Sequence, residues 1–492
     1  MIRTFKQRPG GAAGAEALFW RLWDVATTPG VVVGVLVLAL ALALGMVTPV
    51  YVSLMGESPA KLAALPAVLV LGLLLLYDKR VLLVGILLTR AMLDPVLETT
   101  KINIGGLGLG VGLGINLVMM LIATLFVLER PRDFPRHAAA AWWPFMLIVM
   151  VGFAFTPNKA DGIRFVMATL SYFAVFVIGH YLVRNRDDFK FVLKLVICSS
   201  ILPSLYAFVD IGLHARDGSF RLVSAFTHPN ILAFYLTLII SLLLYVLKSP
   251  TFALKQSQRV GVTCYLLLEL GLLLLTQTRS AWIACAAIFT IYAIMFERKY
   301  LLYLLLMPVL AALIPSVRDR ILDLAGGNEV YTYAKLNSFA WRVVLWEAGL
   351  RWMEPSHYLF GYGVEAFRFH SQTFFTMAAG IDWSPHNLLV QLIFDVGVVG
   401  LGSYLYVFWR LIGRLRNLVT LDRLGAVLLI ATMIAHLIVS TSDNIYAYLI
   451  FNWYFWLTIG AACSLAPLTT KKGKPFIAAP PGAGYGVSEG RH

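Results

Sequence analysis

The chain has 492 residues, of which 59% are hydrophobic and only 13% are charged. Its apolar residues are gathered into runs close to the ~20 residues that one membrane-spanning helix needs. This composition excludes a soluble protein with a single anchor, and the lack of short alternating segments excludes a β-barrel.

The apolar runs, taken in chain order, predict an all-α fold: a polytopic transmembrane helical bundle of about 12 to 14 spans. The first run begins well inside the chain and many others follow, so we interpret it as an uncleaved span and not as a signal peptide. The run near 81–97 is the weakest, because Arg90 and Asp94 interrupt it. The expected spans lie near 31–50, 62–77, 81–97, 109–128, 141–156, 163–183, 191–213, 229–247, 260–276, 280–296, 299–315, 386–409, 424–441 and 446–466.

Lysine and arginine residues gather in every second connecting segment. The positive-inside rule assigns such segments to the cytoplasm, so we expect both termini there. The net charge of +14 therefore reflects topology, and no nucleic-acid partner is expected. The expected organisation is a cytoplasmic tail over 1–30, transmembrane helices 1–11 over 31–315, one long outer loop with amphipathic helices over 316–385, transmembrane helices 12–14 over 386–466, and a disordered cytoplasmic tail over 467–492.

Two short outer segments carry arginine at the membrane surface. Arg279 follows Thr276-Gln-Thr278 in a connector between two apolar runs that has no room for soluble structure. Arg221 lies in the loop before Pro229 and Asn230, which open the next expected span, since proline suits a first helical turn. A lone arginine at such a boundary is more often an interfacial anchor than a site residue, so each needs partners to indicate function.

The long outer loop supplies further candidates. Ser338–Trp352 is expected to be an amphipathic helix in which Arg342 and Trp346 lie one turn apart. Gly361-Tyr-Gly363 predicts a turn, and His386-Asn387 opens the following span. The many aromatic residues of this loop suit a lid lying in the headgroup layer; stacking on sugars is the less common alternative.

The outer face therefore gathers basic groups, with Arg221, Arg279 and His386 as the candidate catalytic residues. Arginine grips diphosphate oxygens with a rigid fork and keeps its charge, and histidine can accept a proton from an attacking hydroxyl. No acidic cluster of the kind that binds divalent ions is present in the outer loops, so no metal or other cofactor is expected.

Two acids lie inside expected spans. Glu269 is in the run that precedes Arg279, and Asp395 follows His386 within the same span. Ionisable residues at membrane depth are functional candidates by default. A structural hydrogen bond and a role near the site remain equal alternatives for each.

At these positions the chain resembles the superfamily of O-antigen ligases and O-antigen polymerases, which are bacterial envelope glycosyltransferases. The motifs that carry the resemblance run from about Phe220 to Leu401, and the first part of the chain matches only in hydropathy. Ser224 departs from the family pattern, since relatives often have glycine there. The matching motifs are Arg221-Leu-Val-Ser-Ala-Phe-Thr-His-Pro-Asn230, Thr276-Gln-Thr-Arg-Ser280, Arg342-Val-Val-Leu-Trp346, Gly361-Tyr-Gly363 and His386-Asn387.

The resemblance implies an inverting, metal-independent glycosyl transfer at the periplasmic face of the bacterial inner membrane, from a glycan carried on undecaprenyl diphosphate. It implies that Arg221 and Arg279 bind the diphosphate and that His386 activates the acceptor hydroxyl or stabilises the leaving group. Arg342, Trp346, Asn230 and Asn387 are the implied substrate-binding residues.

Within this superfamily, we predict a polymerase of an exported polysaccharide, such as an exopolysaccharide or O-antigen. The alternative is an O-antigen ligase. The two differ in the acceptor, which is another lipid-linked glycan or a lipid A core, and a polymerase has a chain-length regulator as a further candidate partner. A flippase or transporter is a weaker alternative. A transporter would favour paired repeats and helices broken at the midplane, whereas here the notable polar groups cluster on one side and the longest loop is expected outside.

Overall fold

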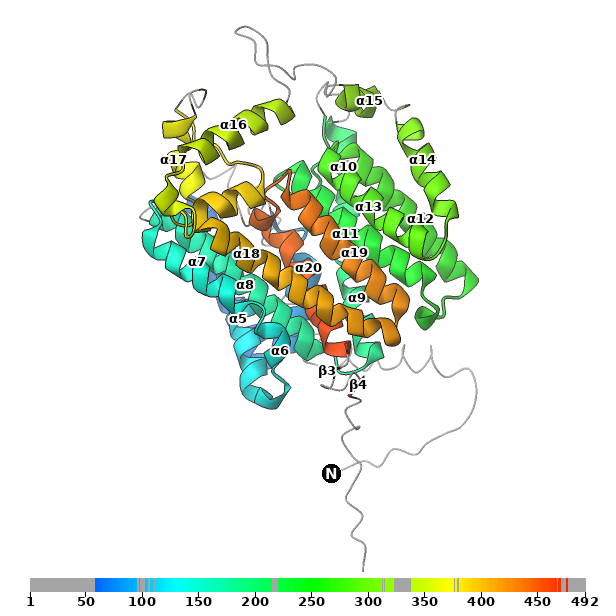
Figure 1. The fold of residues 1–492 in the computed structure, drawn as a ribbon. Coiled ribbons are helices and arrows are strands. Elements are labelled where there is room, and N and C mark those ends of the chain that lie inside the picture. Colours follow the sequence, from blue (N-terminus) through cyan, green and yellow to red (C-terminus); the bar gives the residue numbers. More distant parts are fainter. Residues whose placement is uncertain are drawn as a thin grey trace, which may run out of the picture. The chain divides into compact units, whose positions relative to one another are not determined.

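The computed structural model describes residues 58–94, 97, 102–104, 107–109, 111–214, 220–311, 313, 315–322, 338–375, 377, 380–466, 468–469 and 475–476 (Figure 1). The chain forms two units: Met1–Thr89 with Leu93–Val118, and Arg90–Met92 with Met119–His492. The expected span near 31–50 and most of the expected disordered tail lie outside the described residues.

The smaller unit contains one long helix and a short hairpin. Helix α3 (Ser58–Thr89) is interrupted at Asp78, whose backbone is extended, so the expected boundary between two spans falls at this kink. The expected span near 81–97 is interrupted after Thr89, where the regular helix ends, and Asp94 and Leu97 are again helical. Strands β1 (Ile102–Ile104) and β2 (Leu107–Leu109) then pair antiparallel.

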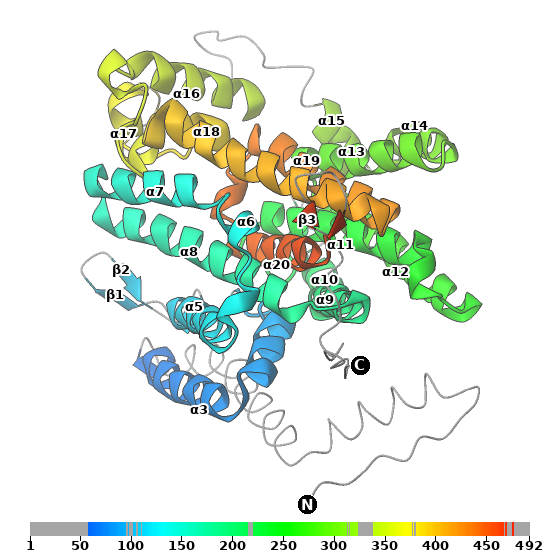
Figure 2. The same ribbon diagram turned by 60° about the horizontal axis from the view of Figure 1, so that its bottom comes forward.

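The larger unit is almost entirely helical, and α8 and α20 pack side by side at its centre (Figure 2). Its elements, in chain order, are α5 (Val111–Glu129, which begins in the smaller unit), η1 (Pro131–Asp133), α6 (Arg136–Ala139), α7 (Trp143–Phe155), α8 (Lys159–Leu182), α9 (Arg186–Cys198), α10 (Ile201–His214), α11 (Pro229–Lys248), η2 (Pro250–Phe252), α12 (Gln256–Leu275), α13 (Arg279–Met295), α14 (Lys299–Ala311), α15 (Pro315–Leu322), α16 (Ser338–Trp352), η3 (Pro355–His357), α17 (Ala366–Phe374), α18 (Leu388–Arg416), η4 (Asn417–Thr420), α19 (Arg423–Ser440), η5 (Ile445–Ala447), α20 (Leu449–Leu465), β3 (Leu468–Thr469) and β4 (Pro475–Phe476).

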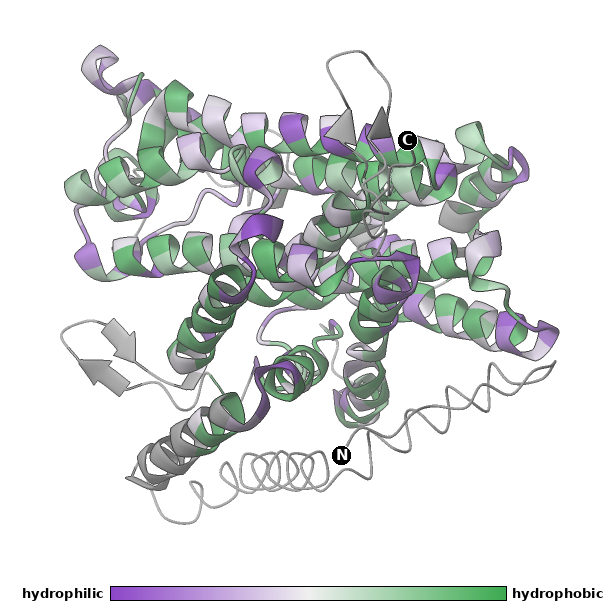
Figure 3. Cartoon of the chain, turned by 90° about the horizontal axis from the view of Figure 1, so that it is seen from below, coloured by the Kyte–Doolittle hydropathy of each residue, from purple (hydrophilic) through white to green (hydrophobic). Residues whose placement is uncertain are grey.

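Hydrophobic residues dominate these helices along their lengths (Figure 3). Within the described residues, 7 helical segments are long and apolar enough to cross a membrane, and α7, α13 and α20 are shorter apolar helices. The all-helical membrane fold is thus confirmed. One expected span is interrupted: the run near 191–213 forms α9 and α10, which separate at Ser199 and Ser200.

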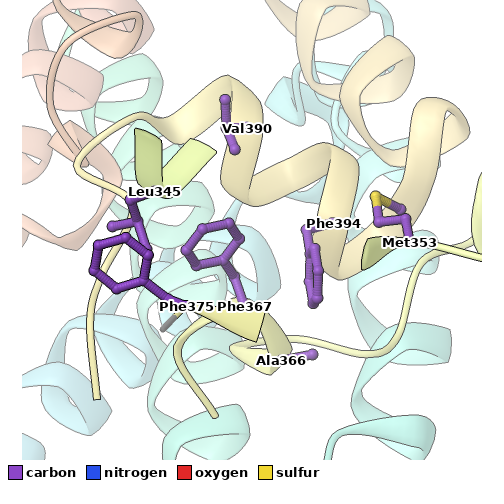
Figure 4. Close-up of a cluster of buried hydrophobic side chains, with 7 residues drawn as sticks. All are labelled: Leu345, Met353, Ala366, Phe367, Phe375, Val390 and Phe394. Atoms are coloured by element: carbon purple, nitrogen blue, oxygen red, sulfur yellow. The ribbon is translucent and has the colours of Figure 1, made fainter. Parts of the chain in front are cut away.

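The segment expected to be a long outer loop forms the helices α15, α16 and α17 (Figure 1), and α16 has the bounds expected from the sequence. Its aromatic residues do not all face the headgroup layer, because Trp341, Trp346 and Trp352 pack against a buried cluster. The members of this cluster come from the loop and from α18 (Figure 4). Phe339 and Phe360 are exposed. The buried members of the cluster are Leu345, Met353, Ala366, Phe367, Phe375, Val390 and Phe394.

Helix α18 is broken where the loop packs against it. Gly397 has φ 72° and ψ −176°, a conformation that only glycine adopts readily. The break leaves the carbonyl oxygens of Phe394 and Asp395 without their helical donors, and the backbone N–H groups of Tyr362 and Gly363 donate to them at 3.0 and 2.8 Å.

The other side of the break is satisfied by the same loop. The N–H groups of Val398 and Val399 donate to the carbonyl oxygens of Tyr358 and Leu359 at 2.9 and 3.2 Å. Irregular backbone is tolerated at membrane depth only when protein groups satisfy its polar atoms. The loop and the broken helix therefore depend on each other, and the turn predicted at Gly361-Tyr-Gly363 is confirmed by positive φ at both glycines.

We expect Gly397→Ala to unfold this region. A Cβ at residue 397 would lie 2.1 Å from the carbonyl oxygen of Leu359, in a backbone conformation that costs alanine about 1–3 kcal/mol before the clash is counted. The matched control is Gly402→Ala in the same helix, where nothing lies within 4 Å of the added methyl. The melting temperature of the purified protein should fall sharply for Gly397→Ala and stay unchanged for Gly402→Ala; similar values would contradict the tight packing of loop and break.

Candidate functional site

Arg221 is fixed to the connector between α12 and α13. Its Nε donates to the carbonyl oxygen of Thr276 at 3.1 Å, and its Nη2 donates to Asn230 Oδ1 at 3.1 Å and Thr278 Oγ1 at 3.2 Å. The backbone N–H of Leu222 donates to the carbonyl oxygen of Leu275. The guanidinium is therefore held at the end of α12 and the start of α11.

The connector itself is a tight, buried turn. Thr276 and Thr278 are buried, and Gln277 between them has φ 53°. Thr278 Oγ1 donates to Asn230 Oδ1 at 3.1 Å, and α13 begins at the next residue, Arg279. Arg221 therefore contacts Thr278, the residue directly before Arg279, and both Arg221 and Thr278 are hydrogen-bonded to Asn230.

The backbone beside Arg221 explains the departure from the family pattern. Ser224 has φ 54°, in the left-handed region where glycine is favoured. Asp210 Oδ2 accepts the N–H groups of Val223 and Ser224 at 3.0 and 2.8 Å, and Ser224 Oγ donates to the carbonyl oxygen of Pro203 at 2.6 Å. These bonds hold a serine in a backbone conformation that glycine would adopt without strain.

His386 and Asn387 have different roles at the start of α18. Asn387 caps the helix, since its Oδ1 accepts the N–H groups of Leu389 and Val390 at 3.0 and 3.2 Å. The side chain of His386 is 40% exposed, and its Nδ1 lies 3.6 Å from Asp443 Oδ1. His386 is therefore accessible to a substrate, whereas the side-chain oxygen of Asn387 is occupied in capping α18.

Asp443, which the sequence interpretation missed, joins these elements. Its Oδ1 accepts from Tyr448 Oη and the N–H of Asn444, both at 2.9 Å, and its Oδ2 accepts from Asn230 Nδ2. Burial alone would raise the pKa of this carboxyl group, but the hydrogen bond and charge of His386 outweigh it, and the pKa is lowered. Asp443 is therefore a buried, ionised partner of His386. The sequence offers one signal for it, a polar Ser-Asp-Asn stretch between two spans.

Arg342 and Trp346 reach the site from the loop helix α16. Arg342 Nη1 donates to the carbonyl oxygen of Ser442 at 2.7 Å, and Trp346 Nε1 donates to the carbonyl oxygen of Pro385. The two side chains thus contact the residues that directly precede Asp443 and His386. Their expected one-turn spacing is what places both on the same face of α16.

The site is rich in positive charge. Helices α11, α13 and α18 begin there, and a helix N-terminus carries a partial positive charge that favours anions. Burial, followed by the charge of Arg221, lowers the pKa of His228, and the charges of His386 and Arg342 act in the same direction. Such an arrangement can hold a phosphate or diphosphate group. Within the described part of the chain, no group of three or more His, Cys, Asp or Glu residues could hold a metal ion.

The two acids expected at membrane depth take part in structural hydrogen bonds. Glu269 is fully buried in α12, and its Oε1 accepts from Ser204 Oγ at 2.7 Å. Asp395 accepts the N–H groups of Glu365 and Phe367 at 2.9 and 2.8 Å, which fixes the start of α17. Asp395 thereby supports the loop.

Residues 264–405 match the family Wzy_C, O-antigen ligase. The match begins in α12 and ends in α18, so it includes Arg279, Arg342 and His386, whereas Arg221 and Asp443 lie outside it. No curated protein matches the chain.

The lowered pKa of His228 predicts a pH-dependent stability. His228 Nδ1 accepts the N–H of Asn230 at 3.1 Å and caps α11, which requires the neutral ring. Because the folded state holds this proton less tightly than the unfolded chain, stability is lost as the pH falls below about 6.5. His228→Asn keeps a capping side chain without the titration. The melting temperature of the wild type should therefore fall more than that of His228→Asn between about pH 7.5 and pH 5.5; equal falls would contradict the role of His228.

Proposed function

We propose that this multi-pass membrane protein, which carries a Wzy_C O-antigen ligase family domain over residues 264–405, polymerises glycan repeat units linked to undecaprenyl diphosphate. The family comprises membrane glycosyltransferases of the O-antigen ligase and polymerase type, and it implies lipid-linked glycan substrates. The product would be an exopolysaccharide or O-antigen, made at the periplasmic face of the inner membrane.

The observation that carries the proposal is the hydrogen bonding of Arg221 to Asn230 and to Thr278, the residue directly before Arg279. Arg221 beside the N-terminus of α11 and Arg279 at the first residue of α13 would supply the charge that a diphosphate needs, and a guanidinium fork suits phosphate oxygens. As the bond between the sugar and the diphosphate breaks, negative charge grows on the leaving oxygen. Fixed donors aimed at that charge lower the barrier more than they strengthen substrate binding.

His386 is the proposed base. Its Nδ1 faces the ionised Asp443, which stabilises a positive charge on the ring and leaves Nε2 to the substrate. The acceptor hydroxyl would lose its proton to Nε2 while its oxygen bonds to the anomeric carbon of the donor sugar. The bond from that carbon to the diphosphate breaks, and undecaprenyl diphosphate leaves on the opposite face, with inversion.

A ligase is the second candidate, and the description of the matched family as O-antigen ligase favours it. The donor chemistry would be the same, and the acceptor would be a lipid A core instead of a second lipid-linked glycan. We favour the polymerase because of the length of the chain and its long outer loop.

Three substitutions test the chemistry. Arg221→Ala, Arg279→Ala and His386→Ala should each lower glycan transfer about 100-fold or more, because each removes a group that acts on the reacting atoms. The assay measures transfer by purified protein from the lipid-linked glycan of the source cells. Arg351→Ala is the matched control, because this arginine is exposed on α16 and pairs only with Glu347 in a surface ion pair. Full activity of Arg279→Ala in correctly folded protein would refute the diphosphate assignment.

The size of the glycans in cells lacking the protein distinguishes the candidates. A polymerase defect should remove long polymer while single repeat units are still made. If long chains instead accumulate on the carrier lipid, the protein is a ligase. Repeat units trapped on the cytoplasmic leaflet would identify a flippase and refute the transferase proposal.

A further inference from the structure

Glu365 has a backbone conformation that is unusual for its residue type. Its φ is 62°, in the left-handed region, although it follows a segment in which Gly361 and Gly363 supply the other positive φ values. Its N–H donates to Asp395 Oδ2 at 2.9 Å, so the broken helix α18 holds it in place. Glycine would satisfy this backbone without strain. Non-glycine residues that persist in such positions cluster at functional sites.

The side chain of Glu365 points back to the site. Its Oε1 accepts from Gln391 Nε2 at 3.1 Å, and Gln391 Oε1 accepts from the side-chain amide of Asn444. The N–H of Asn444 donates to Asp443 Oδ1, the oxygen that faces His386. Hydrogen bonds thus join the carboxyl group of Glu365 to Asp443, whose Oδ1 lies 3.6 Å from Nδ1 of the proposed base, His386. Gln391 and Asn444 are buried within this set, whereas Glu365 is only partly buried.

The charge differs on the two sides of Asp443. Arg221 and Arg279 lie on the side of α11 and α13. Glu365 lies on the other side, and burial, followed by the charge of Asp161 at the start of α8, raises its pKa. The raised pKa favours the neutral carboxyl group, which can both donate hydrogen bonds to sugar hydroxyl groups and accept hydrogen bonds from them. This side of the site is therefore suited to a neutral sugar.

We propose that Glu365 binds hydroxyl groups of the acceptor glycan, on the opposite side of His386 from the donor diphosphate. The inference rests on the proposed glycosyl transfer and adds an acceptor subsite to it. The carboxyl group forms hydrogen bonds with the sugar that His386 deprotonates, and Gln391 keeps the carboxyl group oriented toward that sugar.

The alternative is that Glu365 serves only to shape the turn before α17. The two roles predict opposite results for Glu365→Gly. Glycine relieves the strained backbone, so a purely structural position should keep full activity and gain stability. An acceptor-binding position should lose acceptor affinity whatever the change in stability.

The experiment measures glycan transfer by the full-length protein in detergent, with the acceptor glycan varied and the lipid-linked donor saturating. Glu365→Gly and Glu365→Gln should raise the KM for the acceptor by about 10- to 100-fold, as expected for the loss of a hydrogen bond, and change kcat less than threefold. Binding of undecaprenyl diphosphate, measured by thermal shift, should be unchanged in both variants.

Two control variants isolate the effect. Ala253→Gly makes the same backbone change at another residue with positive φ, after the far end of α11 from the site, and Glu354→Gln removes an exposed carboxylate of the same loop. Both should keep the acceptor KM of the wild type. An unchanged acceptor KM in folded Glu365→Gly and Glu365→Gln would overturn the proposal. Loss of undecaprenyl diphosphate binding in these variants would also overturn it. If wild-type protein binds no undecaprenyl diphosphate, it is the proposed function that fails.

Discussion

A carboxylate removed from water must be hydrogen-bonded or paired with a positive charge. In this protein, the groups that meet this requirement for Asp443 belong to the candidate site. Asp443 is 1% exposed and is held by Asn230 from α11, Tyr448 before α20 and His386 before α18. Each of these groups stands at a helix end, so satisfying one carboxylate brings several helix ends together. Asn230 in turn receives Arg221 and Thr278, which extends the same network to the start of α13.

The loop that contains α15, α16 and α17 completes the site because backbone hydrogen bonds join it to helix α18. Backbone groups on both sides of the break at Gly397 form hydrogen bonds with backbone groups on both sides of the turn at Gly361. The loop is therefore anchored to α18 before and after the break. In the loop held in this way, Arg342 and Trp346 of α16 form hydrogen bonds with the residues that directly precede Asp443 and His386. A catalytic arrangement held in this way needs little rearrangement when charge develops in the reaction.

Hydropathy predicted the helical fold, and residue chemistry suggested Arg221, Arg279 and His386 as candidates, because single side-chain types at span boundaries are visible in a sequence. The sequence could not show which side chains far apart in the chain contact each other in the fold. Asp443 lies in a short polar turn like any other, and its importance comes from Asn230, which is more than 200 residues away. The break in α18 was equally hidden, since Gly397 looks like an ordinary glycine of an apolar span until the loop packs on it.

The central claim is that the two arginines bind the diphosphate of a lipid-linked donor. Cryo-electron microscopy of the protein in lipid nanodiscs with undecaprenyl diphosphate tests this claim most directly. The account predicts phosphate density within hydrogen-bonding distance of both Arg221 and Arg279, beside the N-termini of α11 and α13. Diphosphate density elsewhere on the molecule, with these arginines still bonded only to protein, would contradict it.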